Sequence, residues 1–221
     1  MRATAGLAIA VVLAVVAGAV LSGSGTAPGT FDYYVLSLSW SPEYCATSGG
    51  NAPNGDLQCR GAKKYGFVLH GLWPQYAKGG WPTTCSTTRA VPPEVIDRVL
   101  PIMPSRALPQ HEWDKHGTCS GKDVGAYFDD AARAFSAIRI PEVYRHPDVA
   151  AHTSAERIRA DFLAANPGLR GDGLAVVCDR DGATLLEVRV CLDKALKPRA
   201  CGRDVRDHCA GDDVTVRPVR R

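Results

Sequence analysis

The segment "HEWDKHGTC", residues 111–119, places two histidines, a glutamate, a lysine and a cysteine within nine positions. On a helix, residues advance by ~100° each, so Trp113 falls on the side that can enter a core and Gly117 can end the helix. Asp114 faces elsewhere, and four other polar side chains share roughly one half of the helix surface: His111, Glu112, Lys115 and His116. The spacing therefore predicts a helix that presents two imidazoles, a carboxylate and an ammonium to one point.

Two other interpretations of this segment stand beside a proton-transfer site. A zinc site of the His-Glu-x-x-His type needs a histidine at the fifth position, where this chain has Lys115. An ammonium group beside a dication is repelled, which disfavours a metal. The segment read alone is equally compatible with a solvated polar face.

A second histidine, His70, lies upstream in "FVLHGLWPQ", residues 67–75. We expect His70 to end a hydrophobic strand, and Gly71 after it allows close approach of another chain segment. Cys85 and Cys119 are placed to tie the two regions together by a disulfide. Two histidines that face each other are a common means of paired acid and base chemistry near neutral pH.

The N-terminal residues 1–29 have the pattern of a signal peptide and a flexible leader. Arg2 supplies a positive start, an apolar run covers 7–21, and small residues follow. The rival interpretation is an uncleaved membrane anchor, but the run of about 15 residues is shorter than the ~20 that a spanning helix needs. We therefore expect a secreted or periplasmic protein with no stable membrane association after the leader is removed.

Residues 30–221 suit a single domain of ordinary size. All eight cysteines lie there, and an even number in an exported chain predicts disulfides. No CxxC pair occurs, which disfavours a zinc ribbon. The formal net charge of +3 is too small to identify a partner by itself.

The periodicity along the chain predicts a mixture of strands and helices. Residues 31–40 alternate as a strand with one buried face, and 46–62 are typical of a loop. Helical spacing recurs over 94–100 and from Asp123 to Ile138, and residues 174–191 indicate a hairpin. No repeat or linker divides the chain, so the predicted fold class is α+β.

Two motifs together resemble the active-site segments of the ribonuclease T2 family: "HGLWP" at 70–74 and "HEWDKHGTC" at 111–119. "FDYYVLSLSWSPEYC" at 31–45 is similar to the start of that fold, and "WPTTC" at 81–85 fits its partner cysteine. The resemblance implies an antiparallel central sheet with helices packed on it, stapled by disulfides. It also implies a metal-independent endoribonuclease without cofactors, which cleaves single-stranded RNA through a 2′,3′-cyclic phosphate with little base preference. Because the ribose 2′-OH is the nucleophile, we expect DNA to remain uncut. We also expect a monomer.

The resemblance assigns a role to each catalytic candidate. His116 would take the proton of the ribose 2′-OH, and His70 would protonate the leaving 5′-oxygen. Lys115 would stabilise the negative charge of the phosphorane, and protonated His111 would bind the phosphate. Glu112 would polarise or orient the same group, or hold His111 or Lys115 in place.

The family uses the position of Trp73 at its main base site, and Trp81 and Tyr76 are further candidates for stacking. Gln75 takes a position where some relatives carry an acidic residue that reads adenine, so a base preference is not transferred. Three histidines have no motif around them and are read as surface residues: His146, His152 and His208.

Pairing of Cys45 with Cys59 would close a local loop. The four later cysteines allow three pairings by arithmetic. The family's arrangement implies a nested one, Cys178 with Cys209 and Cys191 with Cys201.

Two rival functions remain. One is a secreted binding protein on the same scaffold, which would tolerate loss of an acid, a base or the lysine. The other is a metal-dependent hydrolase, which chelation would inactivate.

Overall fold

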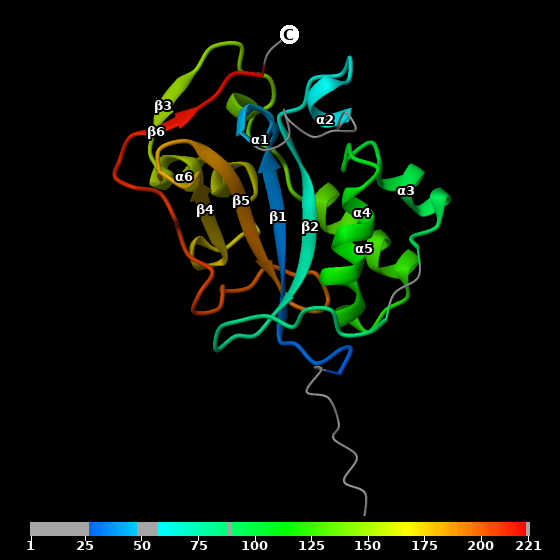
Figure 1. The fold of residues 1–221 in the computed structure, drawn as a ribbon. Helices are drawn as coiled ribbons and strands as arrows, with labels where there is room; N and C mark the ends of the chain where they lie inside the picture. The colour runs from blue at the N-terminus through cyan, green and yellow to red at the C-terminus, as the bar shows by residue number, and fades with distance from the viewer. Residues whose placement is uncertain (1–26, 48–56, 88–89, 220–221) are drawn as a thin grey trace, which may run out of the picture.

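A four-stranded antiparallel sheet forms the centre of the molecule (Figure 1). The computed structural model describes residues 27–47, 57–87 and 90–219, so the predicted leader lies almost wholly outside the described residues. The strands stand in the order β2 (Phe67–Gln75), β1 (Tyr33–Trp40), β5 (Leu185–Leu192) and β4 (Leu174–Cys178). β4 and β5 form the predicted hairpin. A small second sheet pairs β3 (Ala151–Thr153) with β6 (Val214–Val216).

Helices cover one face and one edge of this sheet, which confirms the α+β class. Figure 1 shows α3, α4 and α5 on the β2 side of the sheet; α5 packs on β1 and β2, and α6 packs on β4. Asp123 caps α5, because its carboxylate accepts a hydrogen bond from the Ala126 amide. The helical segments are α1 (Ser41–Thr47), α2 (Leu57–Arg60), α3 (Pro93–Val99), α4 (Leu108–Lys115), α5 (Val124–Ala137) and α6 (Ala155–Ala165), with 3-10 turns at Gly117–Ser120, Glu142–Tyr144 and Gly171–Gly173.

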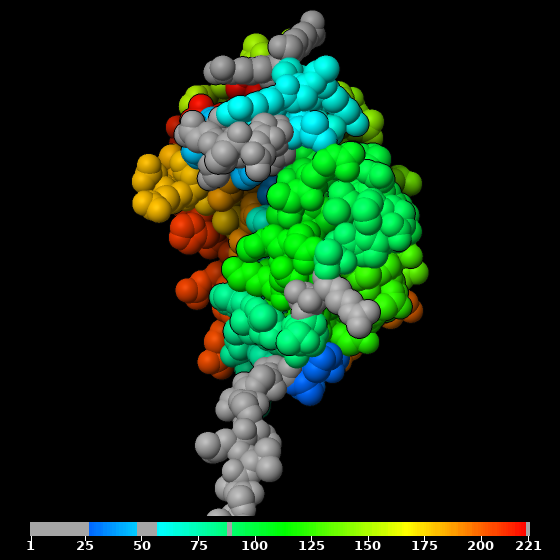
Figure 2. Space-filling view, turned by 45° about the vertical axis from the view of Figure 1, so that its right-hand side comes forward, coloured from blue at the N-terminus to red at the C-terminus, as the bar shows by residue number. Residues whose placement is uncertain are grey.

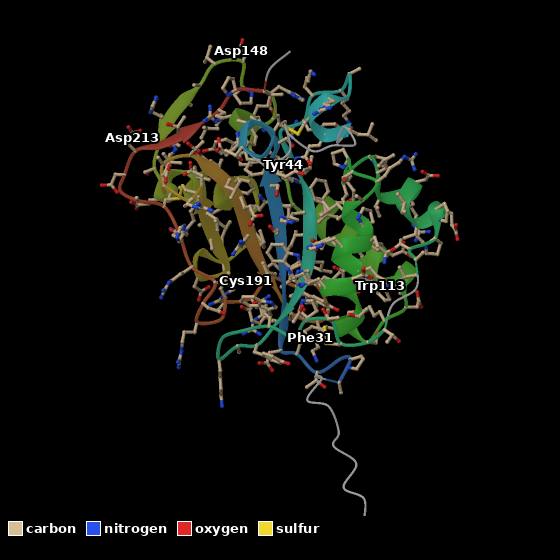
Figure 3. All side chains as sticks on the ribbon, viewed as in Figure 1. Phe31, Tyr44, Trp113, Asp148, Cys191 and Asp213 are labelled. Atoms are coloured by element: carbon tan, nitrogen blue, oxygen red, sulfur yellow. A yellow bond between two sulfur atoms is a disulfide. The ribbon has the colours of Figure 1, made fainter. Side chains whose placement is uncertain are left out.

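The central strand β1 is buried on both faces, so the prediction of one buried face is wrong. One face carries Leu36, Leu38 and Trp40 into the main hydrophobic core, beneath the helices. The other face carries Tyr33 and Val35 into a smaller cluster, against which Cys201 and Val205 of the C-terminal segment pack. A segment distant in sequence therefore covers the face that the alternation pattern alone left to solvent. Figure 3 labels Cys191 on β5, a member of this smaller cluster.

The strand β2 continues to Gln75 and carries a bulge at His70, so the prediction that His70 ends the strand is wrong. Ser37 of β1 pairs with Gly71, whereas the next residue, Leu38, pairs with Leu69. His70 is the extra residue. A bulge inserts one residue into the alternation, so the side chains after it exchange faces.

Four disulfides staple the fold, and each pairing predicted from the sequence or implied by the resemblance is confirmed. Cys85–Cys119 joins the segment after β2 to the turn after α4, across a sequence separation of 34 residues. The other pairs are Cys45–Cys59, Cys178–Cys209 and Cys191–Cys201.

The Cys85–Cys119 bond is expected to stabilise the fold mainly by restricting the unfolded chain. Replacing both residues with serine should lower the free energy of unfolding by roughly 3–4 kcal/mol, the chain-entropy value for a loop of this length. Urea denaturation followed by tryptophan fluorescence measures the change. A loss well under ~1 kcal/mol would show that the unfolded chain is not restricted by this bridge.

Candidate active site

A cavity of about 310 Å³ lies between β2, α4, β5 and the C-terminal segment. In the space-filling view the molecule is hollowed between the green surface of the helices and the orange and red surface of β5 and the C-terminal segment (Figure 2). All eight predicted catalytic and substrate-binding residues line the cavity. The full lining is Val35, His70, Trp73, Gln75, Trp81, His111, Glu112, Lys115, His116, Arg189, Asp204 and Val205.

Two other features fall outside this cavity. Tyr76, a further stacking candidate, packs against the main hydrophobic core instead. A larger cavity of about 620 Å³ near the other end of β1 is bordered by Lys64, Tyr65 and Arg217. None of the described residues that line this larger cavity is a histidine, so volume alone does not mark the site.

The helix α4 presents its polar side chains as the sequence predicts. Pro109 lies in its first turn, where a missing amide proton costs nothing, and His116 forms its C-cap. Trp113 points away from the cavity and packs on Tyr127, with ring centroids 5.9 Å apart. Figure 3 labels Trp113 on α4. The opposite side of the helix borders the cavity with His111, Glu112, Lys115 and His116.

Glu112 is the buried centre of the site, with 1% of its surface exposed. The indole N–H of Trp73 donates a hydrogen bond of 2.7 Å to Glu112 Oε2, and Glu112 Oε1 lies 3.7 Å from Nε2 of His70. Burial raises the pKa of Glu112 to about 7, against the opposing effects of His70 and the Trp73 hydrogen bond. Below that pH the carboxyl is largely protonated and can donate a hydrogen bond.

Gly71 makes room for this contact. A Cβ at position 71 would lie 2.0 Å from Glu112 Oε2 and 2.3 Å from Trp73 Nε1. The close approach expected at Gly71 is therefore present, and its purpose is to admit the Glu112–Trp73 hydrogen bond.

His70 is held by a carboxylate from another strand. Its Nδ1 lies 2.7 Å from Oε1 of Glu187 on β5. Burial acts to lower the pKa of His70, but the hydrogen bond with Glu187 and the charges of Glu187 and Glu112 outweigh burial and raise it above 6.5. His70 is therefore favoured in its protonated form near neutral pH.

His116 also packs against Trp73 but has the opposite electrostatic environment. The Trp73 ring centroid is 5.1 Å from that of His70 and 5.4 Å from that of His116. Burial and the positive charge of Lys115 lower the pKa of His116 to about 3. The two imidazoles are thus biased to opposite protonation states, as an acid and a base require.

His111 and Lys115 are exposed at the rim of the cavity. Burial and the charge of Lys115 lower the pKa of His111 below 6.5. The protonated His111 expected from the sequence is therefore disfavoured in the free protein, and a bound phosphate would be needed to raise its pKa again.

Sequence reasoning missed several residues of the site, chiefly Glu187 and Arg189. A signal was present, because these two charges occupy alternate positions of the otherwise apolar strand "LLEVRVCL". Because side chains alternate along a strand, Glu187 and Arg189 lie on the same face of β5. Burying these charges costs free energy unless they are paired, so the pattern indicates partners on that face. Besides Arg189, three residues that line the cavity were not predicted from the sequence: Val35, Asp204 and Val205.

Metal-ligand clusters are absent from the part of the chain that the structure describes: no group of three or more His, Cys, Asp or Glu side chains there suits a metal ion. The three histidines without a motif are exposed as predicted: His146, His152 and His208.

The family model described as the Ribonuclease T2 family matches residues 31–201. The chain belongs to the ribonuclease T2 family. A ribonuclease of Aeromonas hydrophila is 34% identical to it over 207 residues, which cover 87% of this chain and 88% of the relative. Membership of this family and the similarity to this ribonuclease make the protein a T2-type endoribonuclease.

Two solved plant proteins have a similar fold. The RNase-related protein from Calystegia sepium has a TM-score of 0.68 and 24% identity, and the match covers 86% of this ribonuclease and 98% of that chain. A mutant of RNase MC1, the bitter gourd seed enzyme, solved in complex with 5′-UMP, has a TM-score of 0.63 and 22% identity over 83% of this ribonuclease and 98% of that chain. At these identities the likeness shows the fold.

The close packing around Gly71 gives a test of the site geometry. Gly71→Ala should displace Glu112 or Trp73 and lower kcat on RNA by on the order of 100-fold, because ~1 Å errors in placement cost about that much. Gly168→Ala is the matched control, since no heavy atom lies within 4 Å of the added Cβ there. Steady-state RNA cleavage measures both variants. Wild-type activity in Gly71→Ala would contradict the packing described.

Proposed function

We propose that this endoribonuclease cleaves single-stranded RNA by transesterification through a 2′,3′-cyclic phosphate, with low base specificity and without a metal. The observation that carries the proposal is the pair His70 and His116, which both pack against Trp73 in one cavity and have pKa values shifted in opposite directions. A neutral imidazole and a protonated imidazole beside the same phosphate supply the base and the acid that the reaction needs.

In the first step, His116 takes the proton of the ribose 2′-OH as the oxygen attacks phosphorus. Its lowered pKa keeps the ring neutral and able to accept a proton across the neutral range. His70 donates its proton to the departing 5′-oxygen. DNA lacks the attacking hydroxyl, so we expect it to remain uncut.

Three neighbours act on the phosphate between the histidines. Lys115 brings a positive charge to the cavity rim, where it stabilises the charge that develops on the phosphorane. His111 becomes protonated when the phosphate binds beside it. Glu112 is protonated below pH ~7 and donates a hydrogen bond toward a phosphate oxygen, a role that its raised pKa supports.

The base of the substrate has two candidate surfaces. Trp73 is partly buried and packs against both catalytic histidines, and its N–H is committed to Glu112. Trp81 is 53% exposed at the cavity and is the better stacking platform. Gln75 lines the same cavity and can contact a base edge. The complex of RNase MC1 with 5′-UMP supports nucleotide binding at a site of this fold.

We also propose that the protein acts outside the cytoplasm as a monomer, after removal of the leader. All eight cysteines are paired, which fits an oxidising compartment, as is general for this family. Among the described residues, no helix has the length and apolar character to cross a membrane.

The mechanism is tested by single-turnover digestion of a short RNA in EDTA, with product ends identified by mass spectrometry. Cyclic phosphate ends should form at an undiminished rate, and DNA of the same sequence should stay intact. His70→Ala and His116→Ala should each lower the rate by ~10²-fold or more, the usual contribution of an acid or a base. Full activity in either variant, or inactivation by EDTA, would refute the assignment.

The pH profile provides a separate test. His116, the proposed base, has a pKa of about 3 and therefore stays neutral at mildly acidic pH. Activity should accordingly remain high far into the acid range. In kcat/KM, which reports the free protein, activity should fall on the alkaline side below pH 6.5, where His111 loses its proton. In kcat, which reports the complex, the fall should come above pH 6.5, where His70 loses its proton and Glu112, with a pKa of about 7, loses the proton that it donates to the phosphate. A plateau that extends to pH ~9 would contradict these roles.

A further inference from the structure

Glu187 and His70 meet although a whole strand separates them. β2 carries His70, β5 carries Glu187, and β1 runs between the two. Strands two places apart in a sheet are about 10 Å apart, twice the ~4.8 Å spacing of neighbours. Their side chains meet only above β1, on the face that borders the cavity.

The serines of β1 leave space for this contact. In the sheet register, Ser37 lies between Gly71 and Arg189, and Ser39 lies opposite Glu187. Ser37 is fully buried, and Ser39 Oγ lies 3.5 Å from Glu187 Oε1. A branched or aromatic side chain at either position would occupy the space through which the carboxylate reaches His70.

We propose that Glu187 is a positioning residue of this ribonuclease: it binds Nδ1 of His70, keeps a proton on that nitrogen, and thereby directs Nε2 to the leaving oxygen of the substrate. The proposal rests on the proposed function, in which His70 is the acid. A carboxylate bonded to one ring nitrogen fixes the tautomer and the orientation of an imidazole and stabilises its protonated form.

Arg189 holds the carboxylate in place from the other side. Its Nε and a terminal guanidinium nitrogen donate hydrogen bonds of 2.9 and 2.7 Å to Glu187 Oε2, so Oε1 remains for His70. Burial acts to raise the pKa of Glu187, but His70 and Arg189 together lower it to about 2. The guanidinium carbon also lies 5.3 Å from the Trp73 ring centroid, which joins this group to the wall of the cavity.

The charges that face His70 come from two elements. From β5 they are the Glu187 carboxylate and the Arg189 guanidinium, and from α4 they are Glu112, His111 and His116. Glu112 is 3.7 Å from Nε2 and is largely neutral below pH ~7. Glu187 is therefore the carboxylate that remains ionised beside His70 at the pH where the acid works.

The first experiment compares Glu187→Gln with the wild type by NMR titration of the histidine ring signals. In the variant, the pKa of His70 should fall, because the charge that stabilises the imidazolium is gone. The alkaline limb of kcat should move to lower pH with it, and kcat should drop by ~10- to 100-fold, with KM little changed. Glu187→Asp keeps the charge and should restore most of the pH profile.

A second substrate isolates the proton donation. A nucleoside 3′-(4-nitrophenyl phosphate) releases a phenolate that needs no proton from an acid. The loss caused by Glu187→Gln, like that caused by His70→Ala, should largely disappear on this substrate and remain on a dinucleotide. Equal losses on both substrates, or an unchanged His70 pKa in Glu187→Gln, would overturn the proposal.

The chain offers a matched control in Glu43, a carboxylate 1% exposed that is ion-paired with Arg217 away from the cavity. Glu43→Gln should lower stability but leave the His70 pKa and the difference between substrates unchanged. If Glu187→Gln does not fold, the wild-type titration decides, since a His70 pKa below 6.5 or an unprotonated Nδ1 overturns the proposal. Full dinucleotide activity in His70→Ala would instead refute the proposed acid, while the titration still tests the contact.

Discussion

The bulge in β2 at His70 is the constraint on which the site depends. Without it, the alternation that places Leu69 in the core would also send residues 71, 73 and 75 there. The extra residue instead turns Leu72 into the core and Trp73 and Gln75 toward the cavity. One inserted residue therefore lets a single strand serve both the core and the active site. Gly71, directly after the bulge, leaves the space in which α4 brings Glu112 against the strand.

Two chemically identical rings acquire different properties from their surroundings. His70 and His116 both border Trp73, and burial lowers the pKa of each. Beside His70, the hydrogen bond and charge of Glu187, with a smaller contribution from Glu112, reverse the effect of burial, whereas beside His116 the charge of Lys115 adds to it. Which histidine can act as the acid and which as the base therefore depends on the charges that the fold places near each ring.

Each buried carboxyl group of the site fits only because a neighbouring strand carries small residues. Glu112 depends on a missing Cβ at Gly71, and Glu187 depends on small side chains at Ser37 and Ser39 of β1. In both cases a small residue on a central strand admits a polar group that would otherwise be excluded. These positions do no chemistry themselves, but larger residues there would remove groups that do.

The sequence by itself determined the local features: the helix face that joins His111, Glu112, Lys115 and His116, the hairpin of β4 and β5, and the cysteines available for pairing. These depend on helical or strand periodicity over a few residues, and the resemblance of two motifs supplied the family. Only the tertiary structure decided what lies beside His70, because Glu187 is 117 residues away in sequence and reaches it through the strand order β2–β1–β5. Strand order, a bulge and the covering of β1 by the C-terminal segment depend on long-range packing, which periodicity does not encode.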